Sequence, residues 1–332
     1  MTISKALVTG GGGFVGKAVV KRLIDLGVET RVIGRHSYPE VEAMGASCLV
    51  GNITDEKIIA RATEGVDIVF HVAALAGIWG PWKAYYETNV LGTEKVIAGC
   101  RKNRVPMLVY TSTPSVVFNR ADICGGDERL GYADRFLCHY AKSKVMAEKM
   151  VLTANSPVLA TCALRPHLIW GPGDPHLLPR LLASGRKRQL KRVGSGANLV
   201  DISYIDNVAD AHILAAGNLA GKGTAGGKAY FISQGTPVNL WQWIDELFAM
   251  MDIPKVRSDI SFGMAFRLGL VLETAYRFLQ LNREPRMTRF LAEQLAKSHY
   301  FSIAAARRDL GYSPDVSTEE GLRRTVQWLK SQ

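Results

Sequence analysis

Short apolar runs alternate with helical spacings of apolar residues through the first half of the chain. The runs that we interpret as strands are Lys5–Thr9, Thr30–Gly34, Ser47–Val50, Ile68–His71, Met107–Thr111 and Leu159–Arg165. A long helix is expected to begin near His139. Strands that alternate with helices indicate βαβ units, in which helices connect parallel strands. The pattern therefore predicts an α/β fold with a doubly wound parallel sheet and helices on both of its faces.

The composition changes after the run Trp170–Asp174. Further along, Arg180–Arg192 is basic, Gly221–Lys228 is rich in glycine, and several helical patterns follow. We therefore expect residues 1–171 to form the sheet domain. Residues 172–332 are expected to form a smaller, mainly helical lobe that is partly interleaved with it.

Composition and charge narrow the classes of protein. The chain has 332 residues, of which 47% are apolar and 21% charged, as in an ordinary globular protein and unlike a disordered one. The excess of 41 basic over 30 acidic residues gives a net charge of +11, which could attract nucleic acid, an anionic membrane or an acidic small molecule. The run Arg186–Arg188 lacks interleaved aromatic residues and belongs to no recognised binding module, so no nucleic-acid partner is expected. It is interpreted as a solvated face or as a patch that attracts a carboxylate.

The five cysteines are scattered and form no CxxC motif. They therefore predict neither a disulfide framework nor a metal site. The N-terminal residues lack a signal peptide, and no uncharged run approaches the roughly 20 residues that span a bilayer. We expect reduced thiols and a cytoplasmic location, with peripheral contact with a membrane left open.

A glycine-rich loop, Thr9–Gly16 (TGGGGFVG), directly follows the first expected strand and opens a helix. Gly10 would allow the tight turn, Gly13 would let the backbone approach a pyrophosphate, and Gly16 would let the helix pack closely on the sheet. The N-terminus of the helix would then face the anion. This context of strand, loop and helix predicts a dinucleotide site.

The end of the second strand indicates which dinucleotide is bound. An acidic residue there binds the ribose 2′-hydroxyl of NAD, but this chain has Gly34 and Arg35 at that place. The planar guanidinium of arginine suits a 2′-phosphate, because it binds two oxygen atoms at once. We therefore expect NADP(H) rather than NAD(H).

Tyr140 and Lys144 stand four residues apart on the expected helix, so they share one face of it. An ammonium group beside a phenol is expected to lower the pKa of the phenol, so that Tyr140 can exchange a proton with a carbonyl oxygen near neutral pH. Thr113, at the end of a strand, is the candidate that orients the carbonyl, with Ser112 and Ser115 as rivals. Open α/β sheets bind their ligands at such strand ends.

These motifs together resemble the extended short-chain dehydrogenase/reductases over nearly the whole chain. The stretches that carry the resemblance are Thr9–Gly16, His71–Ala74, Asn89–Thr93, Tyr140–Lys144, Arg165–Asp174 and Tyr204–Ala211. Within that superfamily the chain is most similar to the 3β-hydroxysteroid dehydrogenase-like group, and there to the 2-alkyl-3-oxoalkanoate reductases of bacterial long-chain olefin biosynthesis. The stretches that carry this closer likeness are Ala76–Gly80, Thr111–Val116, Arg165–Leu182, Gly196–Ala211 and Gly227–Ser233.

The resemblance implies a Rossmann-type NADP-binding domain over residues 1–171 and a substrate lobe over 172–332. It implies hydride transfer from NADPH to the 3-keto group of a hydrophobic 3-oxo acid, with Tyr140 as general acid, Lys144 as its tuner and ribose ligand, and Thr113 as the orienting hydroxyl. The full set of expected cofactor contacts is Gly10, Gly12, Gly13, Phe14, Val15, Gly16, Arg35, Asn52, Ile53, Ala73, Ala74, Asn89, Thr111, Lys144, Pro166 and His167.

The chain departs from the family pattern at two places. Thr113 stands where steroid-type members have serine, and a β-branched residue has a stiffer χ1. Asn52 stands where an aspartate usually follows the third strand, so the chain does not match the family's adenine contact at this position.

Other functions stay open at this point. A steroid dehydrogenase has the same motifs, and a sugar-nucleotide epimerase shares the catalytic residues but usually keeps NAD. A non-catalytic NADP-binding regulator would not need Tyr140 with Lys144. A homodimer is expected, and other enzymes of the same pathway or a membrane surface are candidate partners.

The segment 262–281 is the one stretch whose role the pattern leaves open. On a helix, a broad apolar face includes Leu268, Leu272 and Leu279. The polar side consists of Arg267, Glu273, Thr274, Arg277 and Gln280. Such a helix could belong to the core, cover a substrate as a lid, or lie on a membrane.

Overall fold

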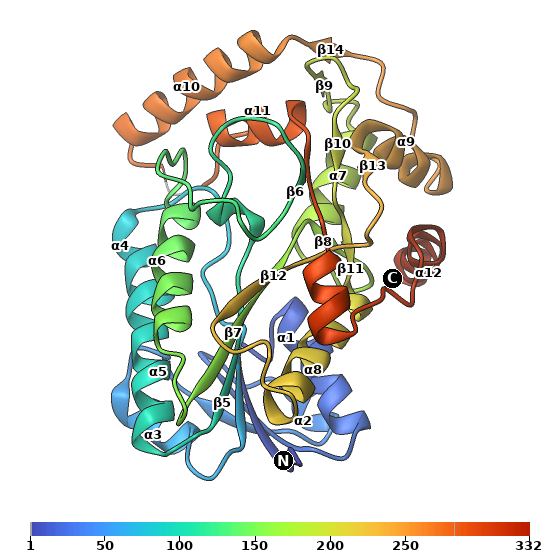
Figure 1. The fold of residues 1–332 in the computed structure, drawn as a ribbon. Coiled ribbons are helices and arrows are strands. Elements are labelled where there is room, and N and C mark those ends of the chain that lie inside the picture. Colours follow the sequence, from blue (N-terminus) through green and yellow to red (C-terminus); the bar gives the residue numbers. More distant parts are fainter. Residues whose placement is uncertain (1, 282) are drawn as a thin grey trace.

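A seven-stranded parallel sheet forms the centre of the computed structural model, which describes residues 2–281 and 283–332 (Figure 1). In order across the sheet the strands are β12 (Lys228–Ile232), β7 (Ala160–Pro166), β5 (Met107–Thr111), β4 (Ile68–His71), β1 (Lys5–Thr9), β2 (Glu29–Gly34) and β3 (Ser47–Val50). The strand order reverses between β1 and β4, which opens a crevice at their carboxyl ends. The predicted doubly wound α/β fold is confirmed.

Helices cover both faces of this sheet, because neighbouring strand residues point to opposite sides. On β1, Leu7 packs in the core formed with α3 (Glu56–Ala62), α5 (Gly92–Lys102) and α6 (His139–Thr153). Val8 packs in the opposite core, with α1 (Phe14–Asp25), α2 (Pro39–Ala43) and α8 (Ile205–Ala220). Because the central strands are buried on both faces of the sheet, their sequences are continuous apolar runs. This explains why the sequence pattern predicts them.

A second group of elements lies above the carboxyl ends of the strands (Figure 1). Its helices are α7 (Leu177–Arg186), α9 (Leu240–Met250), α10 (Phe262–Phe278), α11 (Arg289–Ala296) and α12 (Thr318–Ser331). Its short strands are β6 (Ile123–Gly126), β8 (Ile169–Trp170), β9 (Arg192–Val193), β10 (Leu199–Val200), β11 (Ser203–Tyr204), β13 (Val238–Asn239), β14 (Asp259–Ile260) and β15 (His299–Phe301). The remaining short elements are α4 (Trp82–Tyr85), two π-helical turns (Tyr86–Leu91 and Ala306–Leu310) and a 3₁₀ turn (Pro114–Val116).

The chain passes more than once between these two parts. β6 pairs with β15 in the upper group, and the chain then returns to the central sheet in α6 and β7. After the next stretch in the upper group, β12 lies at the edge of the central sheet beside β7. The division of the chain at residue 171 stays a prediction.

Helix α10 lies on the surface of the upper group and packs against α11 (Figure 1). Only Ala265, Gly269 and Glu273 of the helix are buried. A Cβ atom at Gly269 would come within 2.6 Å of the Arg289 backbone nitrogen, so the glycine permits a close approach to the start of α11. The alternative that residues 262–281 form part of the core is therefore wrong, and Glu273 faces inward instead of lying on an exposed polar side.

Among the described residues, no helix combines the length and apolar character that crossing a membrane requires.

Candidate active site

The glycine loop after β1 forms a tight cradle at the start of α1. Gly10 has a φ of +69°, and a Cβ atom at Gly16 would lie 2.1 Å from the Gly10 carbonyl oxygen. Gly13 is the N-cap of α1, and no side chain caps the helix there. The first N–H groups of α1 are therefore left for an anion, so the loop fits a dinucleotide pyrophosphate.

A cavity of about 510 Å³ extends from this loop to the carboxyl ends of β4, β5 and β7. It brings together most of the residues that the sequence singles out. The predicted site residues that line it are Gly10, Gly13, Phe14, Val15, Gly16, Arg35, Asn52, Ile53, Ala73, Ala74, Thr111, Thr113, Tyr140, Lys144 and Pro166.

Three predicted cofactor contacts do not line this cavity. Gly12 lies against the ring of Tyr38. The amide of Asn89 accepts a hydrogen bond from the Leu75 backbone nitrogen (2.7 Å) and donates to the Leu75 carbonyl oxygen (3.1 Å). It thus holds Leu75, which is itself a lining residue.

His167 points away from the cavity into the upper group. Its Nε2 is 2.6 Å from Nδ1 of His299, and the Nε2 of His299 is 2.9 Å from the Gln294 carbonyl oxygen. His299 must donate to that carbonyl, so its Nδ1 accepts the proton of His167. His167 is therefore placed as a packing residue behind the site.

Tyr140 and Thr113 meet inside the cavity. Tyr140 is the second residue of α6, and Thr113 ends the segment that follows β5 and caps the 3₁₀ turn. Burial raises the pKa of the Tyr140 phenol above its ordinary value, and its hydrogen bond with Thr113 acts in the opposite direction. The expectation of a lowered pKa is therefore wrong for the free enzyme, where Tyr140 keeps its proton at neutral pH.

Lys144 lies one helical turn further along α6 and is 1% exposed. Its Nζ donates to the Thr111 carbonyl oxygen at 2.6 Å and lies 4.1 Å from the centre of the Tyr110 ring. Burial lowers the pKa of Lys144 to about 7, and the smaller effect of the nearby Glu148 carboxylate acts in the opposite direction. The amine thus donates to the strand end and is only partly protonated at neutral pH, and burial is the largest effect on the pKa of Tyr140.

The two serines near Thr113 differ in their environments. The Oγ atom of Ser112 is buried without a hydrogen-bond partner among the described residues, and Ser112 lines the cavity. Ser115 accepts a hydrogen bond from Thr113 (3.2 Å) and is not a lining residue. The geometry favours Thr113, and of the two rival serines only Ser112 lines the cavity.

Several lining residues were not found from the sequence. Tyr38 packs against Gly12 and Gly34 beside Arg35. Asp174 accepts hydrogen bonds from the backbone nitrogens of His176, Leu177 and Leu178, and so caps the start of α7. An aspartate shortly before a helix is a recognisable cap, but nothing local in the sequence indicates that Tyr38 folds back onto the glycine loop.

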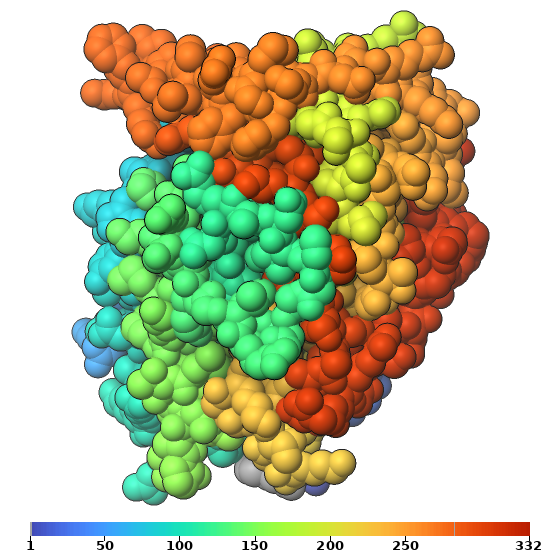
Figure 2. Space-filling view, turned by 45° about the horizontal axis from the view of Figure 1, so that its top comes forward, coloured from blue at the N-terminus to red at the C-terminus, as the bar shows by residue number. Residues whose placement is uncertain are grey.

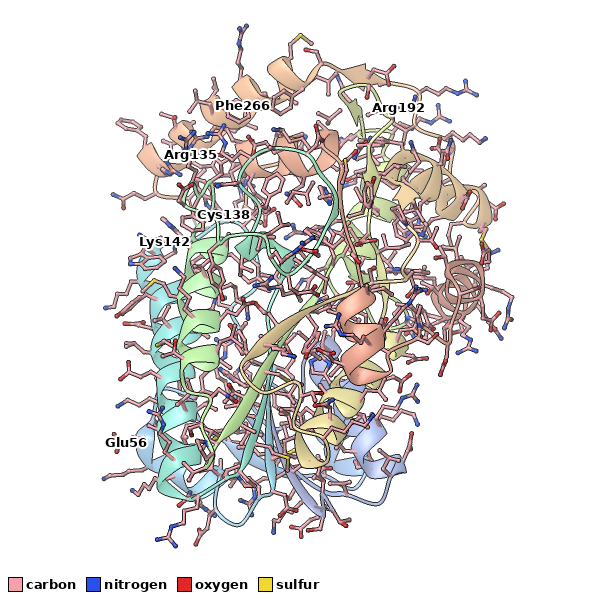
Figure 3. All side chains as sticks on the ribbon, in the orientation of Figure 1. Glu56, Arg135, Cys138, Lys142, Arg192 and Phe266 are labelled. Atoms are coloured by element: carbon pink, nitrogen blue, oxygen red, sulfur yellow. The ribbon has the colours of Figure 1, made fainter. Side chains whose placement is uncertain are left out.

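A second cavity, of about 810 Å³, lies between α10 and the start of α6. Its apolar lining includes Trp79, Tyr276 and Leu281, and its cations include Lys142 and Arg277. Figure 3 shows Cys138 and Lys142 at the end of α6 that is nearest to α10. Cys138 and His139 line this cavity and directly precede Tyr140, so consecutive residues at the start of α6 line the two cavities.

Comparison with known proteins places this site in a family. The profile of the 3-beta hydroxysteroid dehydrogenase/isomerase family matches residues 7–262. A 2-alkyl-3-oxoalkanoate reductase of Shewanella oneidensis is 49% identical over 97% of this chain and 85% of that protein. The enzyme of the same name from Stenotrophomonas maltophilia is 47% identical over 96% of this chain and 98% of its own length. A 3 beta-hydroxysteroid dehydrogenase/Delta 5-->4-isomerase of Mycobacterium tuberculosis is 36% identical over 99% of this chain and 91% of that protein.

Solved structures show the same fold. The crystal structure of gox2253 superposes with a TM-score of 0.80 at 25% identity, covering 99% of this chain and 98% of that one. A UDP-galactose 4-epimerase has a TM-score of 0.73 at 18% identity, with 98% and 99% covered, and this likeness shows the fold alone. The family profile and the close relatives agree: this chain is an oxidoreductase that belongs to the 3-beta hydroxysteroid dehydrogenase/isomerase family.

Proposed function

We propose that this chain uses NADPH to reduce the 3-keto group of a long-chain 2-alkyl-3-oxoalkanoic acid to the 3-hydroxy acid. The observation that carries the proposal is that Tyr140, Thr113 and Lys144 line the same cavity as the glycine loop. The names of the two most similar relatives reported above supply the substrate class. The reaction would be a step of olefinic hydrocarbon biosynthesis in the cytoplasm, and a homodimer or contact with other enzymes of that pathway stays a prediction.

The residues of the cavity fit a dinucleotide along its whole length. The uncapped start of α1 would bind the pyrophosphate, and Ala73 and Ala74 would flank the adenosine side. Lys144 would reach the ribose near Tyr140. When bound, the reduced nicotinamide supplies the hydride.

The choice of NADPH over NADH rests on Arg35. Arg35 is exposed at the end of β2 and lines the cavity, with the Tyr38 ring against the neighbouring Gly34. Asp174 is the only carboxylate in the described lining, and its oxygens are bound to the start of α7. No described carboxylate is thus free to bind a ribose 2′-hydroxyl or to repel a 2′-phosphate.

The raised pKa of Tyr140 suits the reductive direction. A phenol that keeps its proton at neutral pH can donate it to the carbonyl oxygen as that oxygen gains negative charge. Thr113 would orient the same oxygen, because its hydroxyl bonds to Tyr140. Lys144 would stabilise the phenolate that remains, since it lies on the same face of α6.

A second candidate is a 3β-hydroxysteroid dehydrogenase. The 36% identity to the mycobacterial enzyme over nearly the whole chain favours it. The catalytic residues do not separate the two functions, since both need proton exchange at a ring or chain carbonyl. The comparison of substrates described below separates them.

The test is the variant Tyr140→Phe, which removes the hydroxyl and leaves the ring. Loss of a positioned acid is expected to lower kcat/KM about 10²–10⁴-fold while the dissociation constant for NADPH is unchanged. NADPH oxidation with a 2-alkyl-3-oxo acid gives the rate, and NADPH fluorescence gives the binding. Tyr86→Phe is the matched control, because Tyr86 lines neither cavity.

Two results would contradict this proposal. A Tyr140→Phe enzyme that keeps a near wild-type rate contradicts the assignment of the proton donor. A higher kcat/KM for a 3β-hydroxysteroid than for any 2-alkyl-3-oxo acid moves the function to the second candidate.

A further inference from the structure

We propose that α10 binds an anionic phospholipid surface through its outward face. That face consists of Met264, Leu268, Val271, Ala275, Phe278 and Leu279, and we call it the outer face of α10. The spacing of three and four residues places all six on one side of the helix. Phe278 is 86% exposed and Val271 64%.

The outer face has no partner within the described residues, because the helix is held from its opposite side. Ala265 and Gly269 pack towards α11. Glu273 is the only acidic residue of α10 and is also buried there, where it accepts hydrogen bonds from the Arg289 backbone nitrogen (2.7 Å) and from Arg289 Nε (2.9 Å). The helix therefore differs from one packed on a core, because its acidic residue is buried and several of its large apolar side chains are exposed.

A basic segment lies beside the N-terminal end of α10. β9 pairs with β14, the strand directly before α10, so the segment that leads into β9 lies beside the start of the helix. Arg186, Lys187, Arg188 and Lys191 of that segment are exposed, and none has an ion-pair partner among the described residues. Figure 2 shows this segment and α10 on one face of the molecule, and Figure 3 shows Arg192 and Phe266 at the same end.

An anionic lipid surface fits this combination better than other partners do. Apolar side chains enter the acyl boundary while Lys and Arg bind the anionic headgroups. Nucleic acid would leave the apolar residues in contact with water or phosphate. A second copy of this chain would cover the apolar residues, but it would supply no anionic groups for the unpaired cations beside the start of α10.

The other side of α10 faces the cavity next to the active site. Tyr276, Gln280 and Leu281 line the 810 Å³ cavity, and the start of α6 separates that cavity from the catalytic one, because His139 lines the first and Tyr140 the second. Trp79 Nε1 donates to the Leu281 carbonyl oxygen at 3.1 Å and ties the end of α10 to the opposite wall. If the proposed function holds, binding through α10 brings the entrance of this cavity to the bilayer, and a long-chain substrate can enter without crossing water.

The test is co-sedimentation of the full chain with vesicles of phosphatidylcholine alone and of phosphatidylcholine with phosphatidylglycerol. The wild type should bind the vesicles that contain phosphatidylglycerol, and added salt should weaken this binding. Val271→Glu and Phe278→Glu should each reduce the bound fraction by about tenfold or more, because a charge replaces an inserted apolar side chain. The matched control is Val158→Glu, at a residue that is 75% exposed in the loop between α6 and β7, and it should bind like the wild type.

Circular dichroism and turnover of a short, water-soluble substrate show that the variants are folded. Val271 and Phe278 line neither cavity, so their replacement should leave that turnover unchanged. Absence of wild-type binding, equal binding to both kinds of vesicle, or full binding by the two variants would overturn the proposal. So would a wild-type dimer that Val271→Glu dissociates, because the face would then be an interface between copies. Vesicle binding does not depend on Tyr140, so this proposal and the proposed reaction fail independently.

Discussion

Lys144 is a buried amine whose protonation depends on its surroundings. Its spacing from Tyr140 can be read from the sequence, but its pKa cannot, because burial and the contact with the Thr111 carbonyl oxygen arise only in the fold. His212 in α8 holds Thr111 in place. His212 Nδ1 donates to the Val208 carbonyl oxygen, so the Nε2 atom of His212 accepts a hydrogen bond from the Thr111 hydroxyl at 2.8 Å. The strand end and α8 therefore position the amine jointly.

Replacing this amine should stabilise the protein while inactivating it. Between pH 7 and about 10.4, the unfolded chain keeps the Lys144 proton and the folded chain loses it, so the folded state gains stability as the pH rises through this range. Lys144→Met removes the penalty and should raise the free energy of unfolding at pH 7 by about 1–4 kcal/mol. Thermal unfolding of both proteins at several pH values measures the effect.

The advantage of the variant should shrink as the pH approaches 10, where the wild-type lysine is neutral in both states. Lys142→Met, at an exposed residue of the same helix, is the control and should show no such pH dependence. A constant difference between Lys144→Met and the wild type would contradict the lowered pKa.

Arg35 should decide between the two cofactors. Arg35→Asp removes the guanidinium and adds a charge that repels a 2′-phosphate, so the preference for NADPH over NADH should fall about tenfold or more. The ratio of kcat/KM for the two cofactors measures it, and Arg101→Asp, at an exposed arginine outside the cavity, is the control. Equal use of both cofactors by the wild type would contradict the proposal.

At the scale of elements, the sequence predicts the strands that have a local apolar pattern and misses one whose place depends on distant pairing. The expected bounds of the strands that became β1, β3, β4 and β5 agree with the structure. β12 was not expected as a strand, because its place depends on pairing with β7 more than 60 residues earlier and not on a local pattern. The helical period of α10 was visible, but which of its sides faces inward was not, since that depends on Gly269 and Glu273 meeting α11.

The contact at Gly269 should be sensitive to a single methyl group. A Cβ atom there would meet the backbone of Thr288 and Arg289 at 2.6 Å, so Gly269→Ala should lower the free energy of unfolding by about 1–3 kcal/mol. Gly263→Ala in the same helix meets nothing within 4 Å and should be neutral, or stabilising by about 0.5–1 kcal/mol. Urea unfolding of both variants checks the contrast, and an equal effect of the two would show that α10 does not approach α11 this closely.

At the scale of the whole molecule, buried histidines connect the sheet to the elements around it. His71 in β4 bonds Thr9 of β1 and Thr93 of α5 at 2.7 and 2.9 Å. Burial lowers the pKa of His71 to about 3, with Lys144 acting in the same direction, and burial lowers the pKa of His212 to about 4. These histidines are neutral in the folded protein, and unfolding lets them take up protons at mildly acidic pH.

The protein should therefore lose stability on acidification below pH 6.5. In that range the unfolded chain binds more protons than the folded one, at a cost of about 1.4 kcal/mol per pH unit for each such histidine. Asp201 acts in the opposite direction, because burial raises its pKa to about 7, but it offsets only one of the histidines. The Tm should fall between pH 6.5 and pH 5.

His212→Gln isolates one contribution to this slope. The variant should be less stable than the wild type at pH 7 but should lose less stability on going to pH 5. His36→Gln, at an exposed histidine, should follow the wild type. An unchanged slope in His212→Gln would show that this residue is not neutral in the folded protein.

Because α10 buries only Ala265, Gly269 and Glu273, it can separate from the rest of the protein more easily than the other long helices. An element that buries few side chains can detach at a small fraction of the free energy needed to unfold the whole protein. The contacts that would break are those of Gly269, Glu273 and Trp79, whereas the seven-stranded sheet would keep all of its pairings. In amide hydrogen exchange, α10 would then exchange as a separate unit well before the strands. The part of α10 that lines the 810 Å³ cavity can thus lift while the glycine loop and Tyr140 stay in place.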